Sequence, residues 1–204
     1  GVKARLVATD TKRLALAEGV ATVQGESGAN THIVPLKTIS LLERNLTDDG
    51  ELIRVVLRPN EAMFQTERAL IHTRLVEGRF PPYRNIIPKK FDVKLSVAVP
   101  ALLAAVRQAA IMTDDESKRV DFVFTPGQVT LSARGPETGS SLVTLPLPGY
   151  DGPEVAIAFD PHYLIEMLKA NESVGTLTLE MTDGTKPAVF RADGYTYLVM
   201  PLAG

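Results

Sequence analysis

Apolar and polar positions follow a pattern that recurs three times along the chain. Residues 31–35, 95–100 and 155–161 each form a short run, rich in strand-favouring residues, that ends at a proline. After each proline, apolar residues recur at spacings of three and four, which is typical of one face of a helix. Because proline is tolerated in the first turn of a helix, the pattern predicts a strand that passes directly into a helix at each place.

The three predicted helices are short and apolar on one side. Asp160 is expected to cap the third helix, since its side chain can accept a hydrogen bond from a backbone N–H of the first turn. The residues expected to form the buried faces are Ile39, Leu42 and Leu46 in the first helix, Leu102, Leu103, Val106 and Ala110 in the second, and Leu164, Ile165 and Leu168 in the third.

A meander of strands is expected after each helix, because turn signals separate short β-rich runs. The runs lie at residues 52–57, 62–66 and 70–75 in the first copy, and at 176–181, 188–191 and 195–200 in the third. The turn signals include Pro126-Gly127 and Gly135-Pro136 in the second copy, and Asp183-Gly184 and Asp193-Gly194 in the third. Residues 4–23 look like the last strands of an earlier copy, with their turn at residues 10–12.

The repeating unit is therefore a strand, a helix and three strands, which predicts an α+β fold. One unit of about 60 residues is too small to bury its helix well, so two units are expected to pair into a domain. With the seam at residues 88–92, this gives an N-terminally truncated domain at 1–91 and a complete domain at 92–204. The start at Gly1 without Met fits a fragment. A generic two-domain α+β protein remains the alternative.

Composition narrows the classes of function. The 204 residues are 45% hydrophobic and 23% charged, as in ordinary globular proteins, and no apolar run is long enough to span a membrane. The absence of cysteine excludes disulfides and thiolate metal sites, and is compatible with a reducing cytoplasm. A formal net charge of -2 is unlike the basic excess of proteins that grip nucleic acid tightly, so any DNA contact must be local or weak.

Four segments resemble a known family. Val-Ala-Thr-Asp-Thr-Lys-Arg-Leu-Ala at 7–15 is similar to a family segment with Gly-His in place of Thr-Lys, and Ile-Val-Pro-Leu-Lys at 33–37 resembles Ile-Val-Pro-Arg-Lys. Residues 78–88 resemble Gly-Arg-Phe-Pro-Asp-Tyr-Arg-Arg-Val-Ile-Pro, and residues 197–202 resemble Tyr-Val-Val-Met-Pro-Met. The family is the bacterial DNA polymerase III beta subunit, the sliding clamp, and the resemblance covers its C-terminal two-thirds.

The resemblance implies a DNA clamp fold in which helices line a pore. It implies a non-catalytic processivity factor without a cofactor or metal, which encircles duplex DNA as a head-to-tail homodimer ring in the bacterial cytoplasm, at the nucleoid. The implied partners are duplex DNA, the DNA polymerase III alpha subunit, the clamp loader and repair proteins that carry a clamp-binding motif. The fragment alone is not expected to close a ring.

The resemblance also implies a hydrophobic pocket that takes a short partner peptide. One wall would comprise Thr9, Thr11, Lys12, Arg13, Leu14, Pro81, Asn85 and Ile86, and the other Asp160, Tyr163, Thr185, Pro187, Leu198, Val199, Met200, Pro201 and Leu202. The chain departs from the family pattern at Thr11, Lys12 and Asn85, and in ending Ala203-Gly204. Taken by pattern alone, Val199, Met200 and Leu202 would belong to a buried last strand.

Two further sets of residues follow from the resemblance. Lys37, Arg44, Arg107 and Lys169 are expected to face DNA in the pore, although lone surface cations are usually just solvated. Ile111 and Met112, at the end of the second helix, match apolar residues at the ring junction, with an ordinary core position as the alternative.

An enzyme is the main rival interpretation, together with an interaction scaffold unrelated to DNA. His32, His72 and His162 lack the spacing of metal ligands and are interpreted as structural. Residues 25–28 lack the strand-to-helix context of a nucleophile elbow. Two acidic stretches, at 48–51 and 114–116, could bind a divalent cation but are interpreted as solvated loops.

Overall fold

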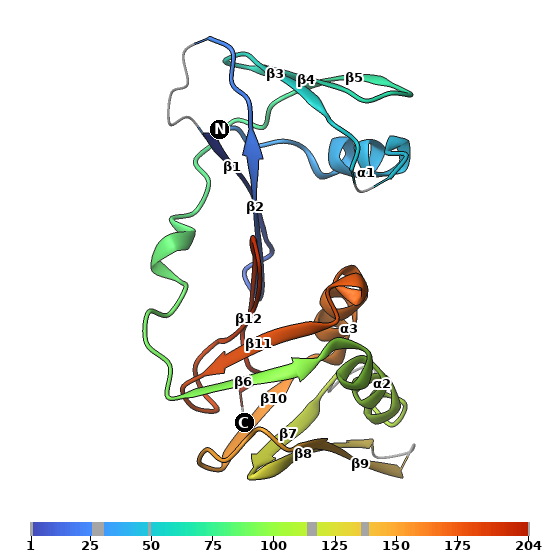
Figure 1. Cartoon of the computed structure of the whole chain (residues 1–204), viewed down its shortest axis with the longest axis vertical. Helices are drawn as coiled ribbons and strands as arrows, with labels where there is room; N and C mark the ends of the chain where they lie inside the picture. The colour runs from blue at the N-terminus through green and yellow to red at the C-terminus, as the bar shows by residue number, and fades with distance from the viewer. Residues whose placement is uncertain (1, 26–30, 49, 114–117, 136–138, 204) are drawn as a thin grey trace. The chain divides into compact units, whose positions relative to one another are not determined.

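The computed structural model describes residues 2–25, 31–48, 50–113, 118–135 and 139–203 (Figure 1). The chain divides into two compact units, one formed by Gly1–Thr22 with Tyr83–Gly204 and the other by Val23–Pro82. Each unit is described separately below.

A six-stranded antiparallel sheet organises the larger unit. Its order is β1 (Val2–Thr9), β2 (Arg13–Ala21), β13 (Tyr195–Val199), β12 (Ala188–Ala192), β11 (Thr176–Met181) and β6 (Val93–Ala98). The pairing of β2 with β13 sets Leu14 opposite Leu198, so strands from the two ends of the sequence lie side by side (Figure 1).

A four-stranded antiparallel sheet and two helices complete the larger unit. The sheet order is β10 (Val155–Phe159), β7 (Val120–Thr125), β8 (Gly127–Gly135) and β9 (Gly139–Leu147). Helices α2 (Val99–Ala110) and α3 (Pro161–Ala170) pack against each other and share one hydrophobic core with both sheets. Short 3-10 helices, η1 (Tyr83–Asn85) and η2 (Glu172–Val174), occur in the connections.

The smaller unit contains one helix and three strands in its described residues. Helix α1 (Leu36–Asn45) packs against the sheet β3 (Arg54–Leu57), β4 (Glu61–Gln65) and β5 (Leu70–Arg74) through β5. The buried Thr38 hydroxyl donates a hydrogen bond of 2.9 Å to the hydroxyl of Thr73 on β5. The side chain of α1 that faces the sheet at this point is polar, and its hydrogen bond to Thr73 holds α1 against β5.

The structure confirms most elements that the sequence predicts, within a residue or two. All three helices begin within one residue of their prolines, and the Asp160 side chain caps α3 by accepting a hydrogen bond from the His162 N–H at 2.9 Å. The α+β class is likewise confirmed. Helices α2 and α3 bury the predicted Leu102, Leu103, Val106, Leu164 and Leu168.

Two predictions in the first copy are wrong. Residues 31–34, including His32, form no strand. The Ile33 carbonyl oxygen accepts a hydrogen bond from the Val76 N–H at 2.8 Å. The predicted face of α1 is not its most buried side, because Ile39 is 37% exposed while Thr38 is buried. Pattern alone does not distinguish an extended connection from a paired strand.

The compact units do not coincide with the expected division at residue 91. Strands β1 and β2 belong to the same sheet as β13, so residues 2–21 pack with the C-terminal part of the chain. Continuity of one sheet does not determine where a domain ends, and the division into 1–91 and 92–204 stays a prediction.

Candidate functional site

The predicted site residues on β2 and β13 lie on the two faces of the sheet where these strands pair. Side chains alternate between the faces of a strand, so neighbours in sequence separate. Leu14 and Leu198 pair in register and lie on one face, whereas Arg13 and Val199 pair on the other. The face that carries Arg13 also packs against the core shared with α2 and α3.

The opposite face carries a small apolar cluster, named here the outer-face cluster: Leu14, Val189 and Leu198, with the partly buried Met200 packed against them. The connection after residue 82 crosses this face and packs Tyr83, Ile87 and Phe91 against the cluster. A cluster with a flexible, polarizable Met at its margin can adapt to different apolar side chains.

Two backbone hydrogen bonds hold the last residues beside the turn between β1 and β2. The Met200 N–H donates to the Lys12 carbonyl oxygen at 2.8 Å, and the Leu202 N–H donates to the Ala158 carbonyl oxygen at 2.8 Å. Residues 200–202 therefore run between the β1–β2 turn and β10. Their side chains are partly exposed, which differs from the fully buried last strand that pattern alone would suggest.

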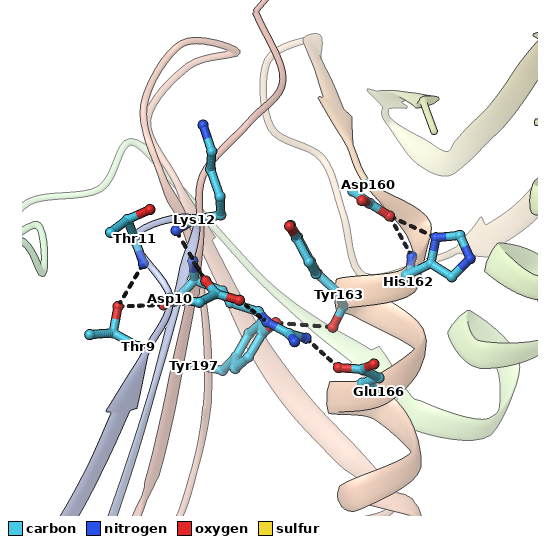
Figure 2. Close-up of polar contacts among 10 residues, drawn as sticks. Thr9, Asp10, Thr11, Lys12, Asp160, His162, Tyr163, Glu166 and Tyr197 are labelled. Atoms are coloured by element: carbon cyan, nitrogen blue, oxygen red, sulfur yellow. Dashed lines mark hydrogen bonds and ion pairs between the residues drawn. The ribbon is translucent and has the colours of Figure 1, made fainter. Parts of the chain in front are cut away.

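Arg13 is the centre of the polar contacts on the other face. Its guanidinium pairs with Asp10 at 2.9 Å and with Glu166 of α3, and lies 4.5 Å from the centre of the Tyr163 ring. The Tyr197 hydroxyl donates to the Tyr163 carbonyl oxygen at 3.0 Å, as Figure 2 shows. These contacts tie the β1–β2 turn to the first turns of α3.

The charges in this cluster perturb one another. Burial raises the pKa of Asp10, but hydrogen bonds from Arg13 and from the backbone N–H groups of Lys12 and Arg13 outweigh it and hold that pKa below its usual value. Burial lowers the pKa of Arg13, but the hydrogen bonds to Glu166 and Asp10 raise it by more. The net pKa lies above the usual value, so the guanidinium stays charged. Burial raises the pKa of Tyr197, which keeps the phenol protonated.

The β1–β2 turn is closed by its own side chains. The Thr9 hydroxyl donates to the Arg13 carbonyl oxygen at 2.7 Å, and the Asp10 carboxylate accepts from the Lys12 and Arg13 N–H groups at 3.1 and 3.0 Å (Figure 2). Thr11, at the tip, has a φ of 74°, in the left-handed region. β-Branched residues are strained there, and the family's glycine would not be.

Thr11→Gly is therefore expected to raise the free energy of unfolding by about 1 kcal/mol, because it removes the left-handed strain of a side chain that carries a Cβ. Chemical denaturation measures the change. Lys12→Gly is the matched control, since Lys12 in the same turn does not have a positive φ and should lose stability. A Thr11→Gly protein no more stable than the parent would contradict the strain argument.

A second loop lies at the end of β11. The Asp183 carboxylate accepts from the Thr185 N–H at 2.8 Å, from its hydroxyl at 2.7 Å and from the Lys186 N–H at 3.1 Å. These bonds lower the pKa of Asp183 to about 2. The closed loop leads through Pro187 into β12 and leaves Thr185 exposed.

His162 is held by Asp160, whose carboxylate lies 3.0 Å from its Nδ1 (Figure 2).

The structure brings together part of the predicted peptide site. Leu14, Leu198 and Met200 meet in the outer-face cluster, while Arg13, Asp160 and Tyr163 lie on or near α3. Asn85 and Ile86 are exposed on the connection that crosses the outer face, and Pro81 belongs to the smaller unit. The role of all these residues in peptide binding stays a prediction.

Sequence reasoning missed several members of this region. Glu166 pairs with Arg13 from a distant helix, and Val189, Ile87 and Phe91 contribute to the outer-face cluster. The apolar residues could have been found from the alternation on β12 and from the apolar positions at the Pro88 seam. No local signal in the sequence pairs Glu166 with Arg13.

The predicted DNA-facing cations are exposed in both units. Arg44, Arg107 and Lys169 each occupy the last turn of α1, α2 and α3 respectively, where a cation also complements the helix dipole. Lys37 lies in the first turn of α1. At the end of α2, Ile111 is 68% exposed and Met112 is partly buried, so Ile111 is not an ordinary core residue.

Neither a metal site nor a membrane span is found in the part of the chain that the structure describes. No group of three acidic or histidine side chains there could hold a metal ion. No helix there is both long and apolar enough to cross a membrane. His72 contacts Glu61 at 2.9 Å, and Glu51 accepts hydrogen bonds from Thr47 and Glu67. Residues 26–28, Asp49 and 114–116 lie outside the described residues.

Comparisons with known proteins agree across nearly the whole chain. The family model for the central domain of the DNA polymerase III beta subunit matches residues 1–82, and that for its C-terminal domain matches residues 84–203. The beta sliding clamp of Chlamydia pneumoniae is 28% identical over 201 residues, which cover 98% of this chain and 54% of that protein.

Solved structures show the same likeness. The DNA polymerase III subunit beta from Pseudomonas aeruginosa superposes with a TM-score of 0.90 at 25% identity, covering 99% of this chain and 56% of that one. A Caulobacter crescentus beta sliding clamp, with polyethylene glycol bound to a suggested beta-motif tethering region, gives a TM-score of 0.88 at 29% identity. The match covers 99% of this chain and 54% of that one.

The fold is thus the α+β sliding clamp fold. The chain belongs to the DNA polymerase III beta subunit family, the beta sliding clamps, which are non-catalytic polymerase subunits. It spans about half the length of the curated relatives that it matches.

Proposed function

We propose that the chain is part of a DNA sliding clamp, a processivity factor that encircles duplex DNA in the bacterial cytoplasm and docks the replicative polymerase. Family membership supports this role. The net charge of -2 fits a ring that holds DNA by enclosure, because weak phosphate contacts leave such a ring free to slide. Lys37, Arg44, Arg107 and Lys169 would supply those contacts, and Ile111 with Met112 would contribute to the ring junction.

Partner proteins would dock by a short peptide on the outer-face cluster. The observation that carries this proposal is the meeting of Leu14, Leu198 and Met200 on one sheet face, beside a turn held by Arg13. Apolar side chains of the peptide would lie against the cluster while the polar rim fixes its direction. The Caulobacter crescentus structure, with its suggested beta-motif tethering region, supports a docking role.

The proposed domain division is that expected from the sequence, with residues 1–91 as the middle domain of the clamp and residues 92–204 as its C-terminal domain. The family models for these two domains match residues 1–82 and 84–203. The peptide site would lie between β2 and the C-terminal strands. The clamp loader and repair proteins would share the site with the polymerase. Membership of a non-catalytic family argues against the enzyme interpretation.

Met200→Ala is expected to weaken binding of a fluorescent clamp-binding-motif peptide about fivefold, because truncation removes apolar contact at the margin of the cluster. Fluorescence anisotropy measures the dissociation constant. The matched control is Met63→Ala, on β4 of the smaller unit, which should leave it unchanged. Failure of the peptide to bind, or binding undiminished by Met200→Ala, would count against this docking surface.

A further inference from the structure

The outer face of the six-stranded sheet continues past the outer-face cluster. Cross-strand registers place Thr9, Leu14, Leu198, Val189 and Glu180 in one row across the face. The next row along the strands contains Val7, Leu16, Thr196, Arg191 and Thr178. Since residues two apart share a face, the rows are separated by about 7 Å along the strands.

A groove of about 580 Å³ lies over this second row. The sheet contributes Leu16, Arg191 and the Arg5–Glu18 pair, and the connection after residue 82 contributes the opposite side, including Ile87 and Phe91. Ile87 and Phe91 also pack against the outer-face cluster. The groove therefore adjoins the proposed peptide site, and both are bounded by the same connection.

The groove lining carries more positive than negative side chains. Four cations, Arg5, Arg84, Lys89 and Arg191, line it together with two carboxylates, Glu18 and Glu180. Both carboxylates are already paired: Glu18 with Arg5, and the largely buried Glu180 with Arg191 at 2.7 Å. Among the described residues, no ion pair joins Arg84 or Lys89 to a carboxylate, although Arg84 also interacts electrostatically with Glu18. Arg84 lies 5.9 Å from the centre of the Tyr83 ring. The groove lining therefore has an excess of two positive charges.

We propose that this groove binds an acidic segment of a partner, continuous with the peptide docked on the outer-face cluster. Arg84 and Lys89 pair with its carboxylates, and Leu16, Ile87 and Phe91 hold an aromatic or aliphatic side chain of the segment. The proposal rests on the docking role above and extends it from a short motif to the residues that flank the motif. Affinity for different partners would then depend on the charge of those flanking residues.

An acidic peptide fits this groove better than a nucleic acid strand. Glu18 and Glu180 stand within the lining, where they would repel a continuous row of phosphates. The carboxylates of an acidic peptide can pair with Arg84 and Lys89, and an apolar side chain between them can lie against Leu16, Ile87 and Phe91.

The test compares fluorescent peptides by anisotropy at about 50 mM salt, where charge pairs are weakly screened. One peptide carries the clamp-binding motif alone, and two others carry Glu-Glu-Phe-Glu-Glu added at either end. One extended peptide is expected to bind about fivefold more tightly than the motif alone. The double variant Arg84→Glu with Lys89→Glu should lose this gain and leave binding of the unextended motif unchanged.

The matched control reverses two exposed cations of the smaller unit, Arg54→Glu with Arg74→Glu, which changes the net charge equally and should preserve the gain. No gain from either extension, or a gain that survives reversal of Arg84 and Lys89, overturns the proposal. The proposal is also overturned if hexathymidylate lowers the affinity of the extended peptide to that of the unextended motif peptide. That result would assign the groove to nucleic acid.

The groove can also be tested apart from the docking role. Acetylated and amidated Glu-Glu-Phe-Glu-Glu, without a motif, is titrated into the 15N-labelled chain, and amide shifts are expected at Arg5, Leu16 and Phe91. If the motif peptide does not bind but these shifts appear, the docking surface is wrong and the groove is retained. If the motif peptide binds but neither the amide shifts nor the affinity gain of the extended peptides is seen, the docking surface is retained and the groove proposal is rejected.

Discussion

Gly184→Ala is expected to lower the free energy of unfolding by about 3 kcal/mol, in the upper part of the range for overpacking. A Cβ on Gly184 would stand 2.1 Å from the carbonyl oxygen of Ala156 and 3.3 Å from its carbonyl carbon. Both atoms belong to the backbone of β10, so relief requires a shift of a strand rather than rotation of a side chain. Thermal unfolding should show a Tm lower by about 10 °C.

The same substitution should weaken motif-peptide binding, because Gly184 lies in the loop that positions Thr185 and Pro187. Gly149→Ala is the control, since a Cβ at Gly149 meets no atom within 4 Å. It should change the Tm little and leave peptide binding intact. A Gly184→Ala chain as stable as the Gly149→Ala chain would show that the loop and β10 do not approach as closely as described.

Arg13→Met is expected to lower the free energy of unfolding by about 2 kcal/mol. The substitution keeps an apolar stem but removes two ion pairs and the contact with the Tyr163 ring. Exposed ion pairs contribute about 0 to 1 kcal/mol each, and a cation over an aromatic ring about 0.5 to 1. Because Glu166 is 64% exposed, its pair lies at the lower end of that range.

The pH dependence separates this cause from a packing defect. Asp10 has a lowered pKa in the folded chain, so its contribution is present above the unfolded value of about 4 and is lost as the pH falls through the folded pKa. Arg13→Met should raise the pKa of Asp10 in an NMR titration. Its stability deficit should shrink below about pH 4. A deficit independent of pH would mean that lost packing or the lost contact with the Tyr163 ring, and not the lost ion pairs, is responsible.

Much of the fold could be predicted from the sequence because its signals are local. Proline before an apolar helical face located α1, α2 and α3, and the Asp-Gly pairs at 183 and 193 located the turns between the last strands. The failures are non-local. Thr38 is buried because Thr73 lies opposite, and residues 31–34 form no ladder because, among the described residues, no strand runs beside them.

The candidate site shows the same contrast. Leu14, Leu198 and Met200 were expected from the family resemblance, and their alternation places two of them on one face. Glu166 and Val189 were not expected, because their relation to Arg13 and Leu14 arises from packing between segments far apart in the sequence. The groove beside the cluster depends on a connection that lies across the sheet, for which periodicity gives no signal.

The pairing of β2 with β13 also bears on how the molecule is made. Leu14 and Leu198 meet across nearly the whole sequence, and contacts of such separation close slowly because the intervening chain must first be ordered. During synthesis, β1 and β2 emerge long before their partner strand exists. The proposed docking surface is therefore incomplete in the nascent chain until β13 has been translated, so a partially made chain would not bind partner peptides there.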